Sequence, residues 1–371
     1  ANGVTISSTS VNNAGTITNS GTSTGSVLIS APVGANVTGI TQNSTTSALT
    51  VSGAITANAT ATTLTNSNAS GSSVLTVSGG IIGTGNIIIN NNSAIANGVT
   101  ISSTSVNNVG TITNSGNGAG AVLISAPVGA NVTGITQNST TSVLTVSGAI
   151  TANATATTLI NTAGTFTVTG GATGTGNLVL RNNTNTDNAL TVSTASINNT
   201  GTVRNTGAGS GSTLISAVIG TNVTGVTQDS ITSALILSGT NTYASATTIT
   251  SGTLQVGNGA SVGTLGSGAG AVANSGTLRF NSSSAQTISN AITGTGVVTQ
   301  VGAGTTTLSS TSSTYSGGTT ISAGTLSISS DANLGAVPGS VTANSINLNG
   351  GTLLVTADMT INSNRGITLG A

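Results

Sequence analysis

Few side chains in this sequence could carry out catalysis, and the aspartates are the strongest candidates. The chain has four aspartates and four arginines, and it has no lysine, glutamate, histidine or cysteine. Two carboxylates can act together in glycoside hydrolysis, and Asp331 with Asp358 is the most plausible couple. The many serines and threonines lack a base that could activate them as nucleophiles. We therefore predict no catalytic residue and no enzyme, with Asp331 in a turn beside Asn333 and Asp358 at a strand end.

The sequence also has few residues that could form a metal, cofactor or nucleic-acid site. A metal site needs clustered ligands, whereas each aspartate is isolated in the sequence. The runs Gly83-Thr84-Gly85 and Gly294-Thr295-Gly296 have neither a lysine nor a helix after them, so we predict corners of the chain and no phosphate loop. Neutralising nucleic-acid phosphates requires basic side chains, and the four arginines are scattered. We predict no metal, no cofactor and no nucleic-acid partner.

Two kinds of residue could bind a ligand. Tyr243 and Tyr315 occupy matching places in a repeat. We expect them to pack corners, and stacking on glycan rings is the alternative. Thr-x-Thr pairs, such as Thr16-Ile17-Thr18 and Thr111-Ile112-Thr113, could form flat hydroxyl arrays that bind ice or glycans.

The elements that hold these residues are predicted to be strands. Short segments alternate apolar and hydroxyl residues, as in Gly15-Thr16-Ile17-Thr18-Asn19, which is the pattern of a strand with one buried face. Strong helix formers are almost absent, while Val, Ile and Thr recur throughout. Zero net charge and 36% hydrophobic residues argue against a disordered chain. We expect an all-β protein.

A long internal repeat decides between the all-β architectures. Residues 96–159 repeat residues 1–64 without a gap, with differences at Ala14/Val109, Ala48/Val143 and four sites between Thr22 and Ser26. Part of a third copy follows, because Ser216–Gly225 corresponds to Ser125–Gly134. A sandwich or barrel needs strands that differ by position, whereas a solenoid needs each turn to resemble the turn below it. The repeat therefore predicts a parallel β-solenoid (a parallel β-helix).

The size of one solenoid turn, or rung, follows from ordinary strand and loop lengths. A rung should take on the order of 19–24 residues, so the chain should form roughly 15–19 rungs. We divide the sequence into residues 1–234, built from long repeats (1–95, 96–186 and a partial copy, 187–234), and residues 235–371, in which the solenoid continues with a different repeat.

The second repeat resembles a known family. Its clearest copy is GAGTTTLSSTSSTYSGGTTISAGTLSI, residues 302–328, and a related copy precedes it from Leu235. This segment, residues 235–328, resembles the autotransporter-associated β-strand repeat, also called the passenger-associated transport repeat, of bacterial surface and secreted proteins. The resemblance implies a right-handed parallel β-helix that is exported to the cell surface.

These observations favour a structural role outside the cell. We expect an extracellular or bacterial cell-surface protein without a membrane span, since no stretch approaches the ~20 apolar residues that a span needs. The leading hypothesis is a non-enzymatic β-solenoid that supports adhesion, matrix or biofilm. One alternative is a protomer that assembles end to end with copies of itself into a filament or sheath. Another is an ice-binding or glycan-binding solenoid, with host-surface or matrix glycans as partners.

Overall fold

The computed structural model describes residues 3–68, 70–102 and 104–370. Almost every regular element in these residues is a short strand. Within the strands, buried Val, Ile and Leu alternate with outward Thr, as in Leu49–Val51 and Leu144–Val146, because successive side chains of a strand point to opposite faces. The single 3₁₀ helix of the described residues is η1 (Asp331–Leu334). The all-β prediction is confirmed.

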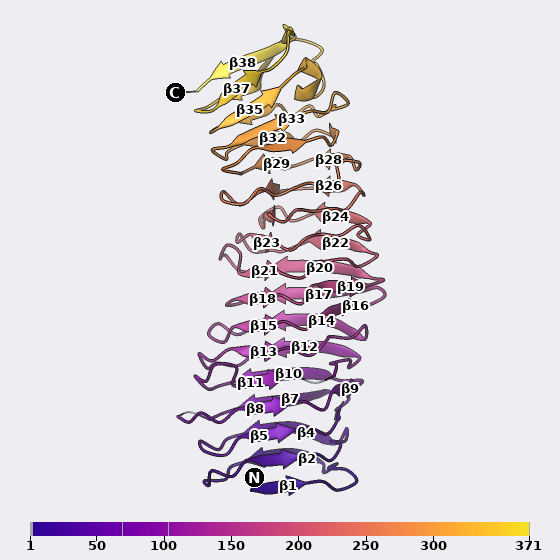
Figure 1. Ribbon diagram of the computed structural model, residues 1–371, viewed down its shortest axis with the longest axis vertical. Helices are drawn as coiled ribbons and strands as arrows, with labels where there is room; N and C mark the ends of the chain where they lie inside the picture. Colours follow the sequence, from indigo (N-terminus) through magenta and orange to yellow (C-terminus); the bar gives the residue numbers. More distant parts are fainter. Residues whose placement is uncertain (1–2, 69, 103, 371) are drawn as a thin grey trace. The chain divides into compact units, whose positions relative to one another are not determined.

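The chain forms two compact units. Unit 1 consists of residues 1–184 and 189–195, and unit 2 consists of residues 185–188 and 196–371. Within each unit, strands from successive rungs stack in parallel as flat layers (Figure 1). The predicted boundary at residues 234/235 concerns the type of repeat, and it stays a prediction.

Two long columns of strands build unit 1. In sheet A the strands are β1 (Val4–Ile6), β3 (Val27–Ile29), β5 (Leu49–Val51), β8 (Leu75–Val77), β11 (Val99–Ile101), β13 (Val122–Ile124), β15 (Leu144–Val146), β18 (Phe166–Val168) and β21 (Leu190–Val192). In sheet C they are β2 (Gly15–Asn19), β4 (Val37–Gln42), β7 (Ala61–Asn66), β10 (Asn86–Asn91), β12 (Gly110–Asn114), β14 (Val132–Gln137), β17 (Ala156–Asn161) and β20 (Asn177–Asn182).

A third column, column B, follows sheet A and precedes sheet C in each rung of unit 1. It contains the paired strands β6 (Ile55–Ala57) with β9 (Ile81–Gly83), and β16 (Ile150–Ala152) with β19 (Ala172–Gly174). Elsewhere it is reduced to single parallel bridges, such as Val106 to Val128. One rung therefore passes through A, B and C before the chain returns to A.

Unit 2 repeats this plan. Its sheet A strands are β23 (Thr213–Ile215), β25 (Leu235–Leu237), β27 (Thr253–Val256), β29 (Thr277–Phe280), β32 (Val297–Gln300), β34 (Thr319–Ile321), β36 (Thr342–Leu348) and β38 (Arg365–Leu369). Sheet C has β22 (Thr202–Asn205), β24 (Gly225–Gln228), β26 (Thr247–Ile249), β28 (Val272–Asn274) and β31 (Ile292–Thr293). Sheet D, which follows sheet A in a rung, has β30 (Gln286–Ile288), β33 (Thr305–Leu308), β35 (Thr325–Ile328) and β37 (Thr352–Val355).

Every pairing named above is parallel, so the predicted parallel β-solenoid is confirmed, and its described residues make about 16 turns. This number lies within the predicted range of rungs. Register partners in sheet A of unit 2 lie between 19 residues apart, for Leu235 and Leu254, and 27 apart, for Thr319 and Ile346. The longest rungs exceed the expected length because loops absorb the extra residues. The right hand of the coil stays a prediction from the family resemblance.

Buried amide side chains accompany the aliphatic core. Three equivalent pairs occur, Asn19 with Gln42, Asn114 with Gln137, and Asn205 with Gln228, with Nδ2 to Oε1 distances of 2.8, 2.7 and 2.8 Å. In the first pair, Gln42 Nε2 also donates to the carbonyl oxygens of Ser44 and Ser47, each at 2.7 Å. These bonds satisfy buried polar groups that would otherwise be costly, and they tie the end of a sheet C strand to the following turn.

The two long copies, residues 1–64 and 96–159, are aligned differently in sheets A and C. In sheet A, successive partners lead from Val4 to its sequence equivalent Val99. In sheet C, the column that starts at Ile17 reaches Asn114, although the sequence equivalent of Ile17 is Ile112. A displacement of two residues keeps every side chain on its own side of the sheet. The sheet therefore tolerates it.

Candidate functional site

The two tyrosines are buried in the solenoid. Tyr243 and Tyr315 are each 1% exposed. The Tyr243 hydroxyl lies 2.9 Å from Thr247 Oγ1, and the Tyr315 hydroxyl lies 2.7 Å from Thr319 Oγ1. The prediction that they pack corners is confirmed. The glycan-stacking alternative is wrong, because neither ring face is accessible to a sugar.

Burial also changes the acidity of these tyrosines. It raises the pKa of Tyr243 and of Tyr315 from 10.0 to about 12, because the phenolate would lose its hydration. The hydrogen bonds to Thr247 and Thr319 act in the opposite direction, and for Tyr315 the charge of Arg365 does so as well. Desolvation is the largest cause in both cases, so both side chains stay neutral far above physiological pH.

Each tyrosine ring is covered by a glycine. A Cβ on Gly266 would lie 2.2 Å from the Tyr243 carbonyl oxygen and 3.1 Å from its ring, and one on Gly335 would lie 2.2 Å from the Tyr315 carbonyl oxygen and 2.8 Å from its ring. Both glycines have positive φ, 74° and 77°, a conformation that glycine adopts without strain. A side chain at either position would have to displace the backbone beside it.

A polar side chain from further along the chain completes each arrangement. Asn290 Nδ2 donates to the Leu265 carbonyl at 3.2 Å, and Arg365 Nη1 donates to the Leu334 carbonyl at 2.9 Å. Leu265 and Leu334 are the buried residues that immediately precede the two glycines. A tyrosine, a Leu-Gly pair and a side-chain donor are thus stacked in order at both places.

The two aspartates considered for hydrolysis have different surroundings. Asp331 begins η1 after the N-cap Ser330, and its Oδ1 and Oδ2 accept from Arg365 Nε at 2.8 Å and Nη2 at 3.1 Å. Asp358 is exposed. The Asp331 carboxylate is therefore engaged in a largely buried ion pair, and the residue lies in the one-turn helix η1 beside Asn333. The prediction that Asp358 lies at a strand end is wrong, because β37 ends three residues earlier, at Val355.

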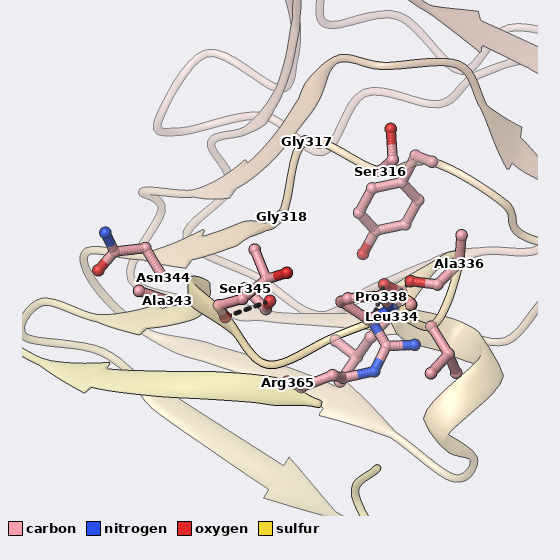
Figure 2. Close-up of a pocket in the computed structure, with 14 residues that line it drawn as sticks. Ser316, Gly317, Gly318, Leu334, Ala336, Pro338, Ala343, Asn344, Ser345 and Arg365 are labelled. Carbon is pink, nitrogen blue, oxygen red and sulfur yellow. Dashed lines mark hydrogen bonds between the residues drawn. The ribbon is translucent and has the colours of Figure 1, made fainter. Parts of the chain in front are cut away.

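A pocket of about 420 Å³ lies beside this ion pair. Figure 2 shows Asn344 and Ser345 on one side, Leu334, Ala336 and Pro338 on the other, and Arg365 at the base. The pocket opens where β36 bulges, since Thr342 pairs with Arg365 but Ile346 pairs with Ile367. The guanidinium donates to Asp331 and to the carbonyls of Leu334, Gly335 and Ala336. Its donors are therefore committed to the protein.

A second hollow lies on the outer face of sheet C in unit 1, with a volume of about 560 Å³. We call it the threonine groove, and it is lined by Thr16, Thr38, Gly39, Thr41, Asn58, Thr60, Ala61, Thr63 and Thr65. Gly39 pairs with Thr16 on one side and with Thr63 on the other. It thus leaves a gap in a row of outward side chains. The expected Thr-x-Thr pairs do face outward. Thr18, Thr41 and Thr65 stack in one column, whereas Gly39 and Ile88 interrupt the neighbouring column of Thr16.

Gly39 has equivalents, Gly134 in β14 and Gly225 in β24, and none of the three has a positive φ. The nearest atom to an added Cβ would lie 3.3, 3.5 and 3.7 Å away, respectively. By contrast, a Cβ on Gly53 would lie 2.0 Å from a backbone oxygen. Glycine inside a strand costs about 0.5–1 kcal/mol relative to alanine. Backbone contacts therefore exclude a side chain less strictly at these three glycines than at Gly53, although Gly39 and Gly134 each lie beside a β-bulge.

The remaining candidates agree with a structural reading. A Cβ on Gly85 would lie 1.6 Å from the Asn58 carbonyl oxygen, and Gly83 and Gly294 have positive φ, so both Gly-Thr-Gly runs form tight corners.

In the part of the chain that the structure describes, no three potential metal-ligating side chains gather. Within the same residues, no helix is long and apolar enough to cross a membrane. Arg204 forms an exposed ion pair with Asp229.

The comparison with protein families bears on the stretch that carries the tyrosines. Residues 232–256 and 298–328 match the family model of the passenger-associated-transport-repeat. The chain contains two such transport repeats. The second match lies within residues 235–328, the segment that resembles the family in sequence, and the first match begins three residues before that segment. Together with the β-solenoid the two repeats fit an autotransporter passenger. Transport repeats suggest a secreted or surface-exposed chain. No curated protein and no solved structure matches the chain significantly.

The two transport repeats occupy different faces of unit 2. In the first, Thr247–Ile249 forms β26 of sheet C and Thr253–Val256 forms β27 of sheet A. In the second, the equivalent strands β34 and β35 belong to sheets A and D. Nevertheless each transport repeat keeps its tyrosine, threonine and covering glycine. The packing of the tyrosine against the next rung is thus the same on either face.

Proposed function

We propose that this chain is a non-enzymatic, structural β-solenoid of a bacterial passenger that supports adhesion, matrix or biofilm outside the cell. The observation that carries the proposal is the pair of transport repeats built into a parallel β-solenoid. The sequence adds a neutral surface rich in hydroxyl and amide groups, with four arginines and four aspartates in 371 residues. Such a surface has little long-range electrostatic attraction or repulsion toward other surfaces.

The side chains best suited to chemistry have structural partners, which supports a role without catalysis. Tyr243 and Tyr315 are buried and hydrogen-bonded to threonines, while Asp331 is held by Arg365. A polysaccharide-cleaving enzyme would release reducing ends from its substrate, and this activity would disappear in Asp331→Asn or Asp358→Asn. We expect the wild-type chain to release none.

The location and the role are tested on producing cells. An antibody against unit 2 should label intact cells or the medium, and a strain that lacks the gene should form less surface-attached biomass. Labelling only after permeabilisation would contradict an extracellular passenger. If producing cells are labelled but the deletion strain attaches as well as they do, only the proposed role in adhesion or biofilm is contradicted.

A second candidate, a self-assembling filament protomer, is favoured by the apolar side chains near β37 and β38. Among the described residues, Leu354, Val355, Ile367 and Leu369 are 44%, 42%, 51% and 75% exposed. The single strand of the described residues that pairs with β38 is β36. Exposed apolar side chains that lie close together can mark a surface for contact with another chain.

Sedimentation and electron microscopy at several concentrations test this candidate. Assembly through β38 predicts particles that grow with concentration in the wild type and that stay small in Ile367→Lys. Val109→Lys is the matched control, because Val109 is also about half-exposed, at 52%, but belongs to unit 1. A constant mass at every concentration would exclude the filament.

A further inference from the structure

Gly39 lies beside a β-bulge in sheet C, because Gly15 pairs with Val37 but Thr16 pairs with Gly39, and it leaves a gap in the outward side chains. It lies inside β4, its φ is not positive, and the atom nearest to an added Cβ is a threonine methyl carbon, Thr16 Cγ2. At 3.3 Å this contact is tight, and Thr16 would have to shift by a few tenths of an ångström to accept a side chain at Gly39. Glycine in a strand interior often marks a β-bulge or a place where a ligand or another backbone approaches closely.

The threonine groove above Gly39 presents hydroxyl groups without partners in the chain. In the described residues, no hydrogen bond within the chain uses the side-chain hydroxyls of Thr16, Thr41, Thr63 and Thr65, which line the groove. Thr38 Oγ1 is engaged, since it donates to the Gly15 carbonyl at 3.2 Å. The free hydroxyls converge on a hollow whose floor is backbone, so they can bind a ligand that enters the gap at Gly39.

The chemistry of the lining selects the ligand. Six threonines, one asparagine, one glycine and one alanine line the groove, and none is charged. A charged ligand would lose hydration there without gaining a counter-charge. A sugar offers hydroxyls that exchange hydrogen bonds with the threonines, and its C–H groups can pack on the threonine methyls. Ice would require a flat regular array, which Gly39 and Ile88 interrupt.

We propose that the threonine groove binds a neutral polysaccharide, with Gly39 as the floor of the site and Thr63 among its hydrogen-bonding groups. The proposal deepens the proposed function, on which it rests, by naming a ligand class for an extracellular passenger. The corresponding surface at Gly134 should bind the polysaccharide more weakly. There Ile160 stands where the first copy has Thr65, and the Thr111 hydroxyl is engaged with Asn86 Oδ1 at 3.1 Å.

Affinity electrophoresis of the full chain in gels that contain dextran, mannan or soluble starch tests the site, with heparin as the anionic control. At least one neutral polymer should retard the wild type, and heparin should not. Gly39→Val fills the gap, and Thr63→Val removes a hydroxyl at nearly constant shape. Each should weaken association about tenfold. Two controls, Gly134→Val and Thr50→Val on sheet A, should stay within about threefold of the wild type.

Melting temperatures separate binding from folding. Valine suits a strand better than glycine does, so Gly39→Val should melt at or above the wild-type temperature while it loses binding. The proposal is overturned if no neutral polymer retards the wild type, or if Gly39→Val and Thr63→Val bind like the wild type. Thermal hysteresis that Gly39→Val abolishes, without retardation in any gel, would assign the groove to ordered water or ice instead.

The outcome is independent of the test of the proposed function. Surface labelling of intact cells does not require an intact groove. Labelling that persists while every neutral polymer fails would therefore refute the carbohydrate site alone. Labelling that is absent would refute the extracellular passenger itself.

Discussion

At the scale of single residues, most side chains that could do chemistry are used to hold the solenoid together. The hydroxyls of Tyr243 and Tyr315 are hydrogen-bonded inside the protein. Arg365, with 3% of its side chain exposed, holds Asp331 and three carbonyl groups of the same loop. A buried polar group is costly unless its partners are present. Each of these residues therefore matters for stability through its contacts.

Stability at high pH should report on the two tyrosines. Their pKa is 10.0 when unfolded and about 12 when folded. Between these values the unfolded chain loses protons that the folded chain keeps, so the free energy of unfolding must fall as pH rises. The contribution of each tyrosine is fully present below pH 10. A shift of about two units amounts to at most about 3 kcal/mol per tyrosine.

Urea unfolding followed by circular dichroism between pH 8 and pH 12 measures this loss. The chain has no lysine, histidine or cysteine that would titrate in the same range. The double variant Tyr243→Phe/Tyr315→Phe should be less stable at pH 8, because the hydroxyls of Thr247 and Thr319 lose their partners. It should also show a much flatter pH dependence. An equal alkaline loss in the double variant would contradict this assignment.

Replacement of Arg365 should be far more damaging than replacement of Arg204. Arg365→Met leaves the Asp331 carboxylate without its partner, which typically costs about 3–5 kcal/mol for a buried pair. Arg204 has 49% of its side chain exposed and its partner Asp229 has 22%, whereas Arg365 is almost fully buried, so Arg204→Ala should cost less than about 1 kcal/mol. Urea unfolding measures both. Equal losses in the free energy of unfolding would show that Arg365 contributes no more than a surface charge. The double variant Arg365→Met/Asp331→Leu should recover part of the stability that Arg365→Met loses.

At the scale of elements, the transport repeat combines strands with the turn that covers its tyrosine. The family model matches residues 232–256 and 298–328, whereas the covering glycines, Gly266 and Gly335, lie beyond the matched residues. The packing of the repeat therefore extends further along the chain than its recognisable sequence does. The same contacts with the next rung form whether the repeat occupies sheets C and A, as in the first copy, or sheets A and D, as in the second.

A single methyl group on the covering glycine should disrupt the second transport repeat. Gly335→Ala places a Cβ 2.2 Å from the Tyr315 carbonyl oxygen at a φ of 77°, and such incompatible substitutions cost more than about 1 kcal/mol. Gly339→Ala is the matched control, because nothing lies within 4 Å of its Cβ. It should change stability by less than about 0.5 kcal/mol. Hydrogen exchange of residues 313–336 should accelerate in Gly335→Ala only.

At the scale of the whole molecule, stability depends on rungs that contact their neighbours. Each rung of a unit pairs in parallel with the rungs beside it, as β3 does with β1 and β5. Little apolar area is available from any one rung, so cooperativity between neighbouring rungs must contribute most of the stability. Opening of one rung exposes the pairing edges of two others.

Trypsin should therefore leave the folded chain almost intact. Its four target arginines lie in strands β20, β22, β29 and β38, where pairing with neighbouring strands occupies the backbone groups that a protease must bind and keeps the segment from detaching into its active site. Digestion under native conditions, followed by electrophoresis, should leave the full-length band. The same digestion in urea should yield small fragments. Rapid cleavage without urea would indicate local opening that this fold does not predict.

Sequence reasoning predicted the repeating parts of the structure and missed the parts that depend on stacking across rungs. The match of residues 96–159 to residues 1–64 predicted parallel stacking, and the common place of Tyr243 and Tyr315 predicted their burial. The pairing of Arg365 with Asp331 spans 34 residues and has no local signature. The threonine groove was also missed, because Thr16 and Thr63 become neighbours of Gly39 through pairing alone.

By itself, the sequence determined that successive rungs are similar to one another and stack in parallel. The alternation of apolar and hydroxyl residues sets which side of each strand is buried, and the near-identical copies give each rung a similar cross-section. The tertiary structure alone decided how far each strand slides along its neighbour, which faces the transport repeats occupy and where a gap opens between threonines. Loop lengths and contacts between distant residues set these features. A slide of two residues keeps the same burial pattern, so the pattern cannot specify it.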